Sequence, residues 1–88
     1  MDNLSARRKS GKVQLVWTHT GAAAYNVYRG TMAGGPYIFL AQTTSTYSTY
    51  LDATVVNGTT YYYVVREAAL NDDELCQSNQ ASAKATAR

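Results

Sequence analysis

Cysteine, histidine and proline occur only once each in this chain of 88 residues. The single cysteine, Cys76, excludes an internal disulfide and every metal site built from several cysteines. The single histidine, His19, excludes histidine-pair metal sites, and no nucleophile motif accompanies it that could form a catalytic triad. We therefore expect no catalytic activity and no cofactor, and we expect His19 to be an exposed loop residue.

Long apolar runs are also missing. No stretch approaches the roughly 20 apolar residues of a membrane helix, so we expect no membrane insertion, and residues 1–4 lack the apolar segment of a signal peptide. The net charge of +2 is too small by itself to indicate a nucleic-acid partner. A hydrophobic content of 45% excludes a disordered chain, and the length predicts one domain over residues 1–88, folded as a monomer.

Alternation of apolar and polar residues, which is typical of strands, recurs along the chain, whereas helical spacing of apolar residues is nearly missing. Val13, Leu15 and Trp17 share one face of a strand, and residues 61–65 show the strongest strand pattern. The same alternation sends Tyr62 and Val64 outward. The residues expected to fill the core are Val13, Leu15, Trp17, Tyr25, Val27, Leu40, Tyr50, Tyr61, Tyr63 and Val65.

Turn residues separate the strand segments about every ten residues. The turns at 34–36 and 57–58 contain glycine, which tolerates positive φ. This spacing predicts an all-β protein, a seven-stranded antiparallel β-sandwich of the immunoglobulin-like class. Its basic edge strand lies at about residues 3–9, and an acidic loop occupies residues 71–74. The last strand is expected within residues 78–87.

The segments, taken in order, resemble those of the fibronectin type III family. The similarity rests on Val13-x-Leu15-x-Trp17, Tyr25-Asn26-Val27-Tyr28-Arg29, Gly34-Gly35-Pro36-Tyr37, Tyr50-Leu51-Asp52 and the run 57–65. The segments 34–37 and 57–63 are most similar to modules of bacterial exported multidomain proteins, such as carbohydrate-active enzymes. The resemblance implies an extracellular or cell-surface location and neighbouring domains of a parent chain as partners. It also implies that the Tyr61 hydroxyl bonds to the backbone just upstream, as in a tyrosine corner.

Two functions remain open at this point. The first is a non-catalytic β-sandwich module that acts as a spacer or protein-interaction unit within a larger exported protein. The alternative is a carbohydrate-binding accessory module of a glycoside hydrolase. A contact surface for a protein or polysaccharide would draw on Tyr28, Tyr62, Asp72, Asp73 and Glu74.

Neither a glycan site nor a Ca²⁺ site is expected from the spacing of these residues. The outward tyrosines, which include Tyr37 and Tyr47, come from different strands, and nothing in the sequence fixes their rings together. The loop 71–74 lacks the glycine turn that would converge six or more oxygens on Ca²⁺. The lysines and arginines at 7–12 are typical of a protected edge strand. Two interpretations of Cys76 remain open: an inert thiol, or a thiol that forms a disulfide with another molecule.

Overall fold

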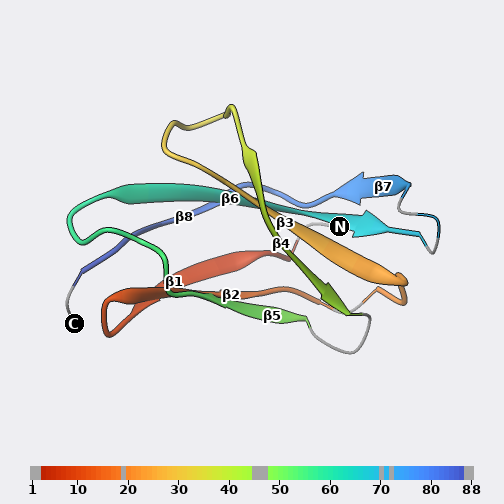
Figure 1. Ribbon diagram of the computed structural model, residues 1–88, viewed down its shortest axis with the longest axis horizontal. Helices are drawn as coiled ribbons and strands as arrows, with labels where there is room; N and C mark the ends of the chain where they lie inside the picture. The colour runs from red at the N-terminus through yellow and green to blue at the C-terminus, as the bar shows by residue number, and fades with distance from the viewer. Residues whose placement is uncertain (1–2, 19, 45–47, 70, 72, 87–88) are drawn as a thin grey trace.

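A computed structural model describes residues 3–18, 20–44, 48–69, 71 and 73–86. Within these ranges no helix is long and apolar enough to cross a membrane. The described residues form eight antiparallel strands in two sheets (Figure 1). The smaller sheet has the order β1-β2-β5, and its strands are β1 (Ser5–Lys9), β2 (Lys12–Val16) and β5 (Thr49–Asp52).

The larger sheet has five strands in the order β4-β3-β6-β7, with β8 also paired to β6. They are β3 (Ala24–Gly30), β4 (Ile38–Thr44), β6 (Thr60–Ala68), β7 (Glu74–Gln77) and β8 (Ala81–Lys84). The predicted all-β sandwich is confirmed, but with eight strands in place of seven. The difference arises because two short strands, β7 and β8, follow one another along β6.

Ser78 and Asn79 lie between β7 and β8 and interrupt the pairing of this part of the chain with β6. The Ser78 hydroxyl accepts a bond of 2.9 Å from the Val65 amide, where a strand would offer a backbone carbonyl. The Asn79 side chain turns to the smaller sheet instead, where it accepts from the Leu4 amide and donates to the Leu4 carbonyl, both at 3.0 Å. Asn79 therefore ties the start of β1 to the larger sheet in the way that a paired backbone would.

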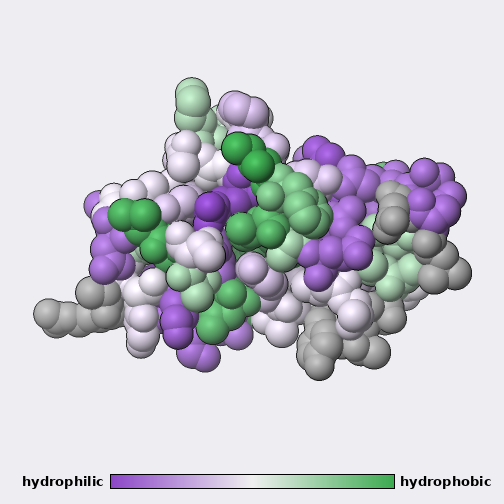
Figure 2. Space-filling view, viewed as in Figure 1, coloured by the Kyte–Doolittle hydropathy of each residue, from purple (hydrophilic) through white to green (hydrophobic). Residues whose placement is uncertain are grey.

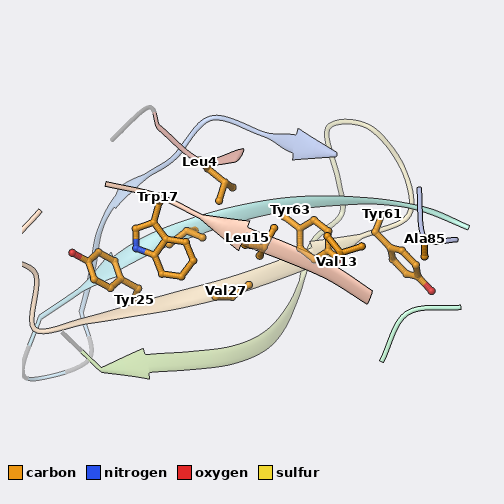
Figure 3. Close-up of a cluster of buried hydrophobic side chains, with 10 residues drawn as sticks. Leu4, Val13, Leu15, Trp17, Tyr25, Val27, Tyr61, Tyr63 and Ala85 are labelled. Carbon is orange, nitrogen blue, oxygen red and sulfur yellow. The ribbon is translucent and has the colours of Figure 1, made fainter. Parts of the chain in front are cut away.

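The core lies between the two sheets, with Trp17 and Tyr25 at one end and Tyr61 and Ala85 at the other (Figure 3). Its buried residues are Leu4, Val13, Leu15, Trp17, Tyr25, Val27, Tyr61, Tyr63, Val65 and Ala85. Leu40 and Tyr50, which were expected inside, pack against this cluster while partly exposed. Both lie in the outermost strands β4 and β5, where the opposite sheet ends.

Val64 is buried although it lies on the outer face of β6. Its side chain points away from the core, as predicted, but only 1% of it is exposed. An outward position is nevertheless buried here because β6 is an inner strand, flanked by β3 on one side and by β7 and β8 on the other. Tyr28 lies directly opposite Val64 on the same face and belongs to a layer of side chains that covers it. Tyr62 remains partly exposed.

Tyr61 makes the corner contact that the family resemblance implies, with one difference. The Val56 amide donates to the Tyr61 hydroxyl oxygen at 2.9 Å, so the hydroxyl acts as the acceptor. The tyrosine ring is 5% exposed and belongs to the core. The hydroxyl thus satisfies a backbone N–H at the turn that connects the two sheets.

We expect Tyr61→Phe to lower the free energy of unfolding by about 1–2 kcal/mol, because the Val56 N–H loses its acceptor. Tyr62→Phe is the matched control, and its expected cost is under about 0.5 kcal/mol, as for most surface substitutions. Urea denaturation of both variants checks the pair. Equal costs, or the reverse order, would contradict the assignment of inner and outer faces on β6.

The chain enters and leaves the sandwich at opposite ends. Leu4 is bonded to Asn79, whereas Ala85 is bonded to Gly58 and Thr59 at the far end of β8. Ala85 lies six residue steps of mostly extended chain beyond Asn79, which corresponds to about 20 Å. The longest dimension of the molecule is 37 Å.

Candidate functional site

Tyr28, Arg66 and Glu74 meet on the outer face of the larger sheet, although they come from three different strands. The Tyr28 hydroxyl donates to Glu74 Oε2. Arg66 Nη1 donates to Glu74 Oε1 at 2.9 Å, and the guanidinium carbon lies 4.3 Å from the centroid of the Tyr28 ring. A carboxylate, a guanidinium and an aromatic ring are thereby held in mutual contact beside solvent.

Three amide side chains, those of Asn26, Gln42 and Gln77, extend this cluster across the neighbouring strands. Asn26 donates to Glu74 Oε2 at 3.0 Å and accepts from Gln42 at 2.8 Å, so it links β3 to β4 and to β7. Arg66 Nε donates to Gln77 Oε1 at 2.8 Å. We call the six residues together the outer-face network: Asn26, Tyr28, Gln42, Arg66, Glu74 and Gln77.

The protonation equilibria of the network follow from these contacts. The hydrogen bond to Glu74 raises the pKa of Tyr28, with partial burial of the phenol as a smaller cause. Hydrogen bonds from Tyr28 and then Asn26 lower the pKa of Glu74, and the bond to Glu74 raises the pKa of Arg66. At neutral pH the network therefore holds one negative and one positive charge, which neutralise each other.

Phe39 continues the aromatic part of this surface onto the edge strand β4. Its ring lies edge-on to Tyr28, with 5.8 Å between centroids and an angle of 81° between planes. The side chain is 55% exposed. The Tyr28 ring is thus held between the guanidinium of Arg66 and the ring of Phe39.

A second polar cluster is buried, and it joins the two sheets. Asp52, at the end of β5, accepts from the Tyr63 hydroxyl at 2.7 Å and from Arg29 Nη1 at 2.9 Å. It also accepts from the backbone amide and hydroxyl of Thr54, two residues later in the chain. Asp52 is fully buried, and Arg29 lies over the ring of Tyr61 at 4.9 Å. We interpret this cluster as structural, since its acceptors and donors satisfy one another.

The pKa of Asp52 reflects two opposing effects. Burial by itself raises it, but the hydrogen bonds from Thr54, Tyr63 and Arg29 together outweigh burial and hold it below its ordinary value. Burial and the bond to the Asp52 carboxylate raise the pKa of Tyr63. The folded state therefore favours the ionised form of Asp52 and the protonated form of Tyr63.

Acid should consequently destabilise the fold through Asp52. A carboxyl group whose pKa is lower in the folded state contributes stability above its unfolded pKa, about 3.9, and loses it as the pH falls through the folded value. We expect the urea midpoint to decline below about pH 4. Asp52→Asn should show a shallower decline, and Glu74→Gln a smaller change in the same direction, because the pKa of the Glu74 carboxyl is also lowered but this group lies on the surface. Identical slopes for the parent and Asp52→Asn would contradict this assignment.

Apolar side chains surround a groove beside the edge strand β4, where Figure 2 shows hydrophobic residues gathered. The groove has a volume of about 270 Å³, and Arg29 and Tyr61 take part in its lining. Met32, Ile38 and Phe39 around it are all more than half exposed. Gln80 anchors the adjoining loop by accepting from the Gly34 amide at 2.7 Å and from the Tyr37 hydroxyl.

Comparison with known proteins assigns the family. No protein-family model matches the chain. Over 82 residues it is 38% identical to an amylopullulanase of Thermoanaerobacter thermohydrosulfuricus, and the match covers 92% of this chain and 6% of that protein. It superposes on an Fn3-like protein from Clostridium thermocellum with a TM-score of 0.83 and 37% identity, covering 92% of this chain and 85% of that one. The chain belongs to the fibronectin type III-like (Fn3-like) family.

The Fn3-like module is also similar to part of a pectate lyase of Erwinia chrysanthemi, whose structure was determined in complex with tetragalacturonic acid. That match has a TM-score of 0.78 and 27% identity, and it covers 91% of this chain and 27% of the lyase. This chain therefore spans only about 6% of the length of the amylopullulanase and about a quarter of the lyase.

The contact residues expected from the sequence fall in different places on the Fn3-like module. Tyr28 and Glu74 meet in the outer-face network, and Tyr62 lies on the same face of β6, beside Ser82. Asp73 stays in the turn, where Asn71 donates to its carboxylate at 2.9 Å. Asp72, together with His19 and Tyr47, lies outside the described residues.

Two expectations about these residues are corrected. Glu74 is the first residue of β7 and not part of a loop, because it pairs with Ala68 of β6. The Tyr28 ring is fixed in place, because Glu74, Arg66 and Phe39 hold it. The contributions of Arg66 and Asn26 were missed. Both sit at outward positions of their strands, so alternation marks them as surface residues but does not pair them.

The remaining candidates from the sequence lie apart from this surface. Arg7, Lys9 and Lys12 are exposed on the hairpin of β1 and β2, and Arg8 donates to Thr86 at 3.2 Å. Cys76 is an exposed free thiol on β7. Among the described residues, no group of three or more histidine, cysteine or acidic side chains is placed to hold a metal ion.

Proposed function

We propose that this Fn3-like module is a non-catalytic accessory unit of a larger exported enzyme that degrades glycans. In that setting it keeps the neighbouring parts of the chain at a fixed separation. The proposal rests on comparing how much of two similar proteins this module covers. The module covers 85% of the Fn3-like chain from Clostridium thermocellum but only 6% of an amylopullulanase. A unit of this size forms a small part of such an enzyme.

The geometry suits a spacer. The chain enters beside Asn79 and leaves beside Gly58, about 20 Å further along the sandwich. Asn79 and the buried Asp52 cluster connect the two sheets near opposite ends of this path. Neighbouring domains attached at these points are held apart by a continuous core and by cross-sheet bonds.

Single-molecule fluorescence transfer tests this role. Asn3→Cys and Thr86→Cys, in a Cys76→Ser background, carry the donor and acceptor dyes at the two ends. We expect one narrow distance distribution that does not change with urea until the module unfolds. A glycine-serine chain of equal length is the control, with a broad distribution around about 50 Å. A broad distribution for the module itself would contradict the spacer role.

The same preparation tests the other parts of the proposal. As one monomeric folding unit, residues 1–88 should show coincident denaturation by Trp17 fluorescence and far-UV dichroism. As a non-catalytic module, it should release no reducing ends from starch, pullulan or polygalacturonate. Separate transitions, or measurable hydrolysis that persists through repeated purification, would refute the corresponding claim.

A further inference from the structure

Four flat side chains form a strip across the outer face of the larger sheet, one from each of four neighbouring strands. In order they are Phe39 on β4, Tyr28 on β3, Arg66 on β6 and Gln77 on β7. Each lies against the next, through the ring contact, the cation–π contact and the Arg66–Gln77 hydrogen bond. With neighbouring strands about 4.8 Å apart, the strip is about 14 Å long.

The strip is rigid for an exposed surface. Glu74 accepts from Tyr28, Arg66 and Asn26, and so fixes the ring, the guanidinium and an amide together. Val64 beneath this layer is only 1% exposed, which shows that the side chains above it pack closely. Long exposed side chains ordinarily lose rotamer freedom when they bind a ligand, and here much of that loss has already occurred in the free protein.

Hydrogen-bonding capacity is left over along the strip. A guanidinium carries five N–H groups, more than Arg66 uses on Glu74 and Gln77. Within the described part of the chain, the Gln77 amide nitrogen and the Gln42 amide oxygen have no partner, so one donor and one acceptor face solvent beside the rings. The surface therefore combines aromatic rings with unused donors and acceptors.

From this geometry we propose that the strip binds a neutral oligosaccharide. Sugars present apolar C–H faces that pack on rings and hydroxyl groups that both donate and accept, which matches this combination of groups. The charges of Arg66 and Glu74 cancel, so the strip favours a ligand without net charge. A sugar acid would place its carboxylates near Glu74.

This site goes beyond the proposed spacer role, because a spacer needs no ligand. The distance measurement between the chain ends does not depend on sugar binding, and sugar binding does not depend on that distance. Failure of either proposal is therefore recognised separately.

Nuclear magnetic resonance titration of the ¹⁵N-labelled module tests the site, with maltohexaose and cellohexaose as neutral probes. We expect shift changes at the side-chain signals of Arg66 Nε and Gln77, with a Kd of about 1 mM or tighter for at least one probe. No change up to 10 mM of either probe, or changes confined to the groove beside Ile38, would overturn the proposal.

Three variants separate binding from folding. Tyr28→Phe keeps the ring but removes its bond to Glu74, and we expect it to weaken binding about tenfold. Tyr37→Phe removes a comparable hydroxyl bond, to Gln80, away from the strip and should bind like the parent chain. Phe39→Ala removes the exposed ring and should weaken binding at least about fivefold. Equal affinities for all of these variants would overturn the proposal.

Charge supplies the sharpest comparison. Tetragalacturonic acid should bind the parent module at least about tenfold more weakly than the better neutral probe. Glu74→Gln leaves Arg66 without its counter-charge, so it should strengthen tetragalacturonate binding, and it should weaken neutral binding because the Glu74 carboxylate also holds Tyr28 and Asn26 in place. Tight binding of tetragalacturonate by the parent chain, or no response to Glu74→Gln, would overturn the neutral-ligand assignment.

Discussion

Asp52→Ala should lower the free energy of unfolding by about 3 kcal/mol, the largest effect expected for any single polar residue described above. Asp52 is fully buried and accepts from Tyr63, Arg29 and Thr54. Its loss leaves a buried hydroxyl unpaired and removes the counter-charge of Arg29. Leaving such groups unsatisfied costs more than the pair contributes when intact. Urea denaturation at pH 7 measures the change.

Asp73→Ala is the control for the Asp52 experiment, since it removes a carboxylate from an exposed turn. Its expected effect lies within about 0.5 kcal/mol. A cost for Asp52→Ala below about 1 kcal/mol, which is the usual surface range, would show that the cluster contributes little to holding the sheets together.

Trp17→Ala should cost about 3–5 kcal/mol, since it removes the largest side chain of the core. Trp17 is 3% exposed and lies edge-on to Tyr25, with 5.5 Å between centroids. Its indole N–H has no partner among the described residues, so little hydrogen bonding is lost and the cost comes from the cavity. Far-UV dichroism follows the unfolding, because the variant lacks the tryptophan fluorophore.

Val16→Ala is the control for Trp17→Ala. Val16 is the neighbouring residue in the chain, and its side chain lies on the outer face of β2. Val16 is 44% exposed, so we expect a cost below about 1 kcal/mol. If both variants cost the same, the core would not lie on the face of β2 that alternation assigns to it.

Alternation and turn residues predict much of the fold because they act locally. The inner positions of Val13, Leu15 and Trp17 follow from a period of two within one strand. The bend at 57–58 follows from an Asn-Gly pair. Such rules define strands and their inner faces without knowledge of which strands are neighbours.

Strand order and register are what the sequence leaves undetermined. Asp52 meets Arg29 and Tyr63 only because β5 and the larger sheet face each other at one end of the core. Glu74 meets Tyr28 across β6, although 46 residues separate them in the chain. Val64 is covered because β6 is an inner strand, which a pattern confined to β6 does not reveal.

The opposite placement of the two chain ends also determines how the module carries force. Tension applied through Leu4 and Ala85 pulls β1 and β8 in opposite directions along their lengths. The hydrogen bonds from β1 to β2, and from β8 to β6, then lie across the pull and are loaded together in shear. The two hydrogen bonds between Asn79 and Leu4 lie at the point where the tension enters, so they are loaded first. Tension applied at these two points would therefore strain the module as a whole before any single strand could separate from its sheet.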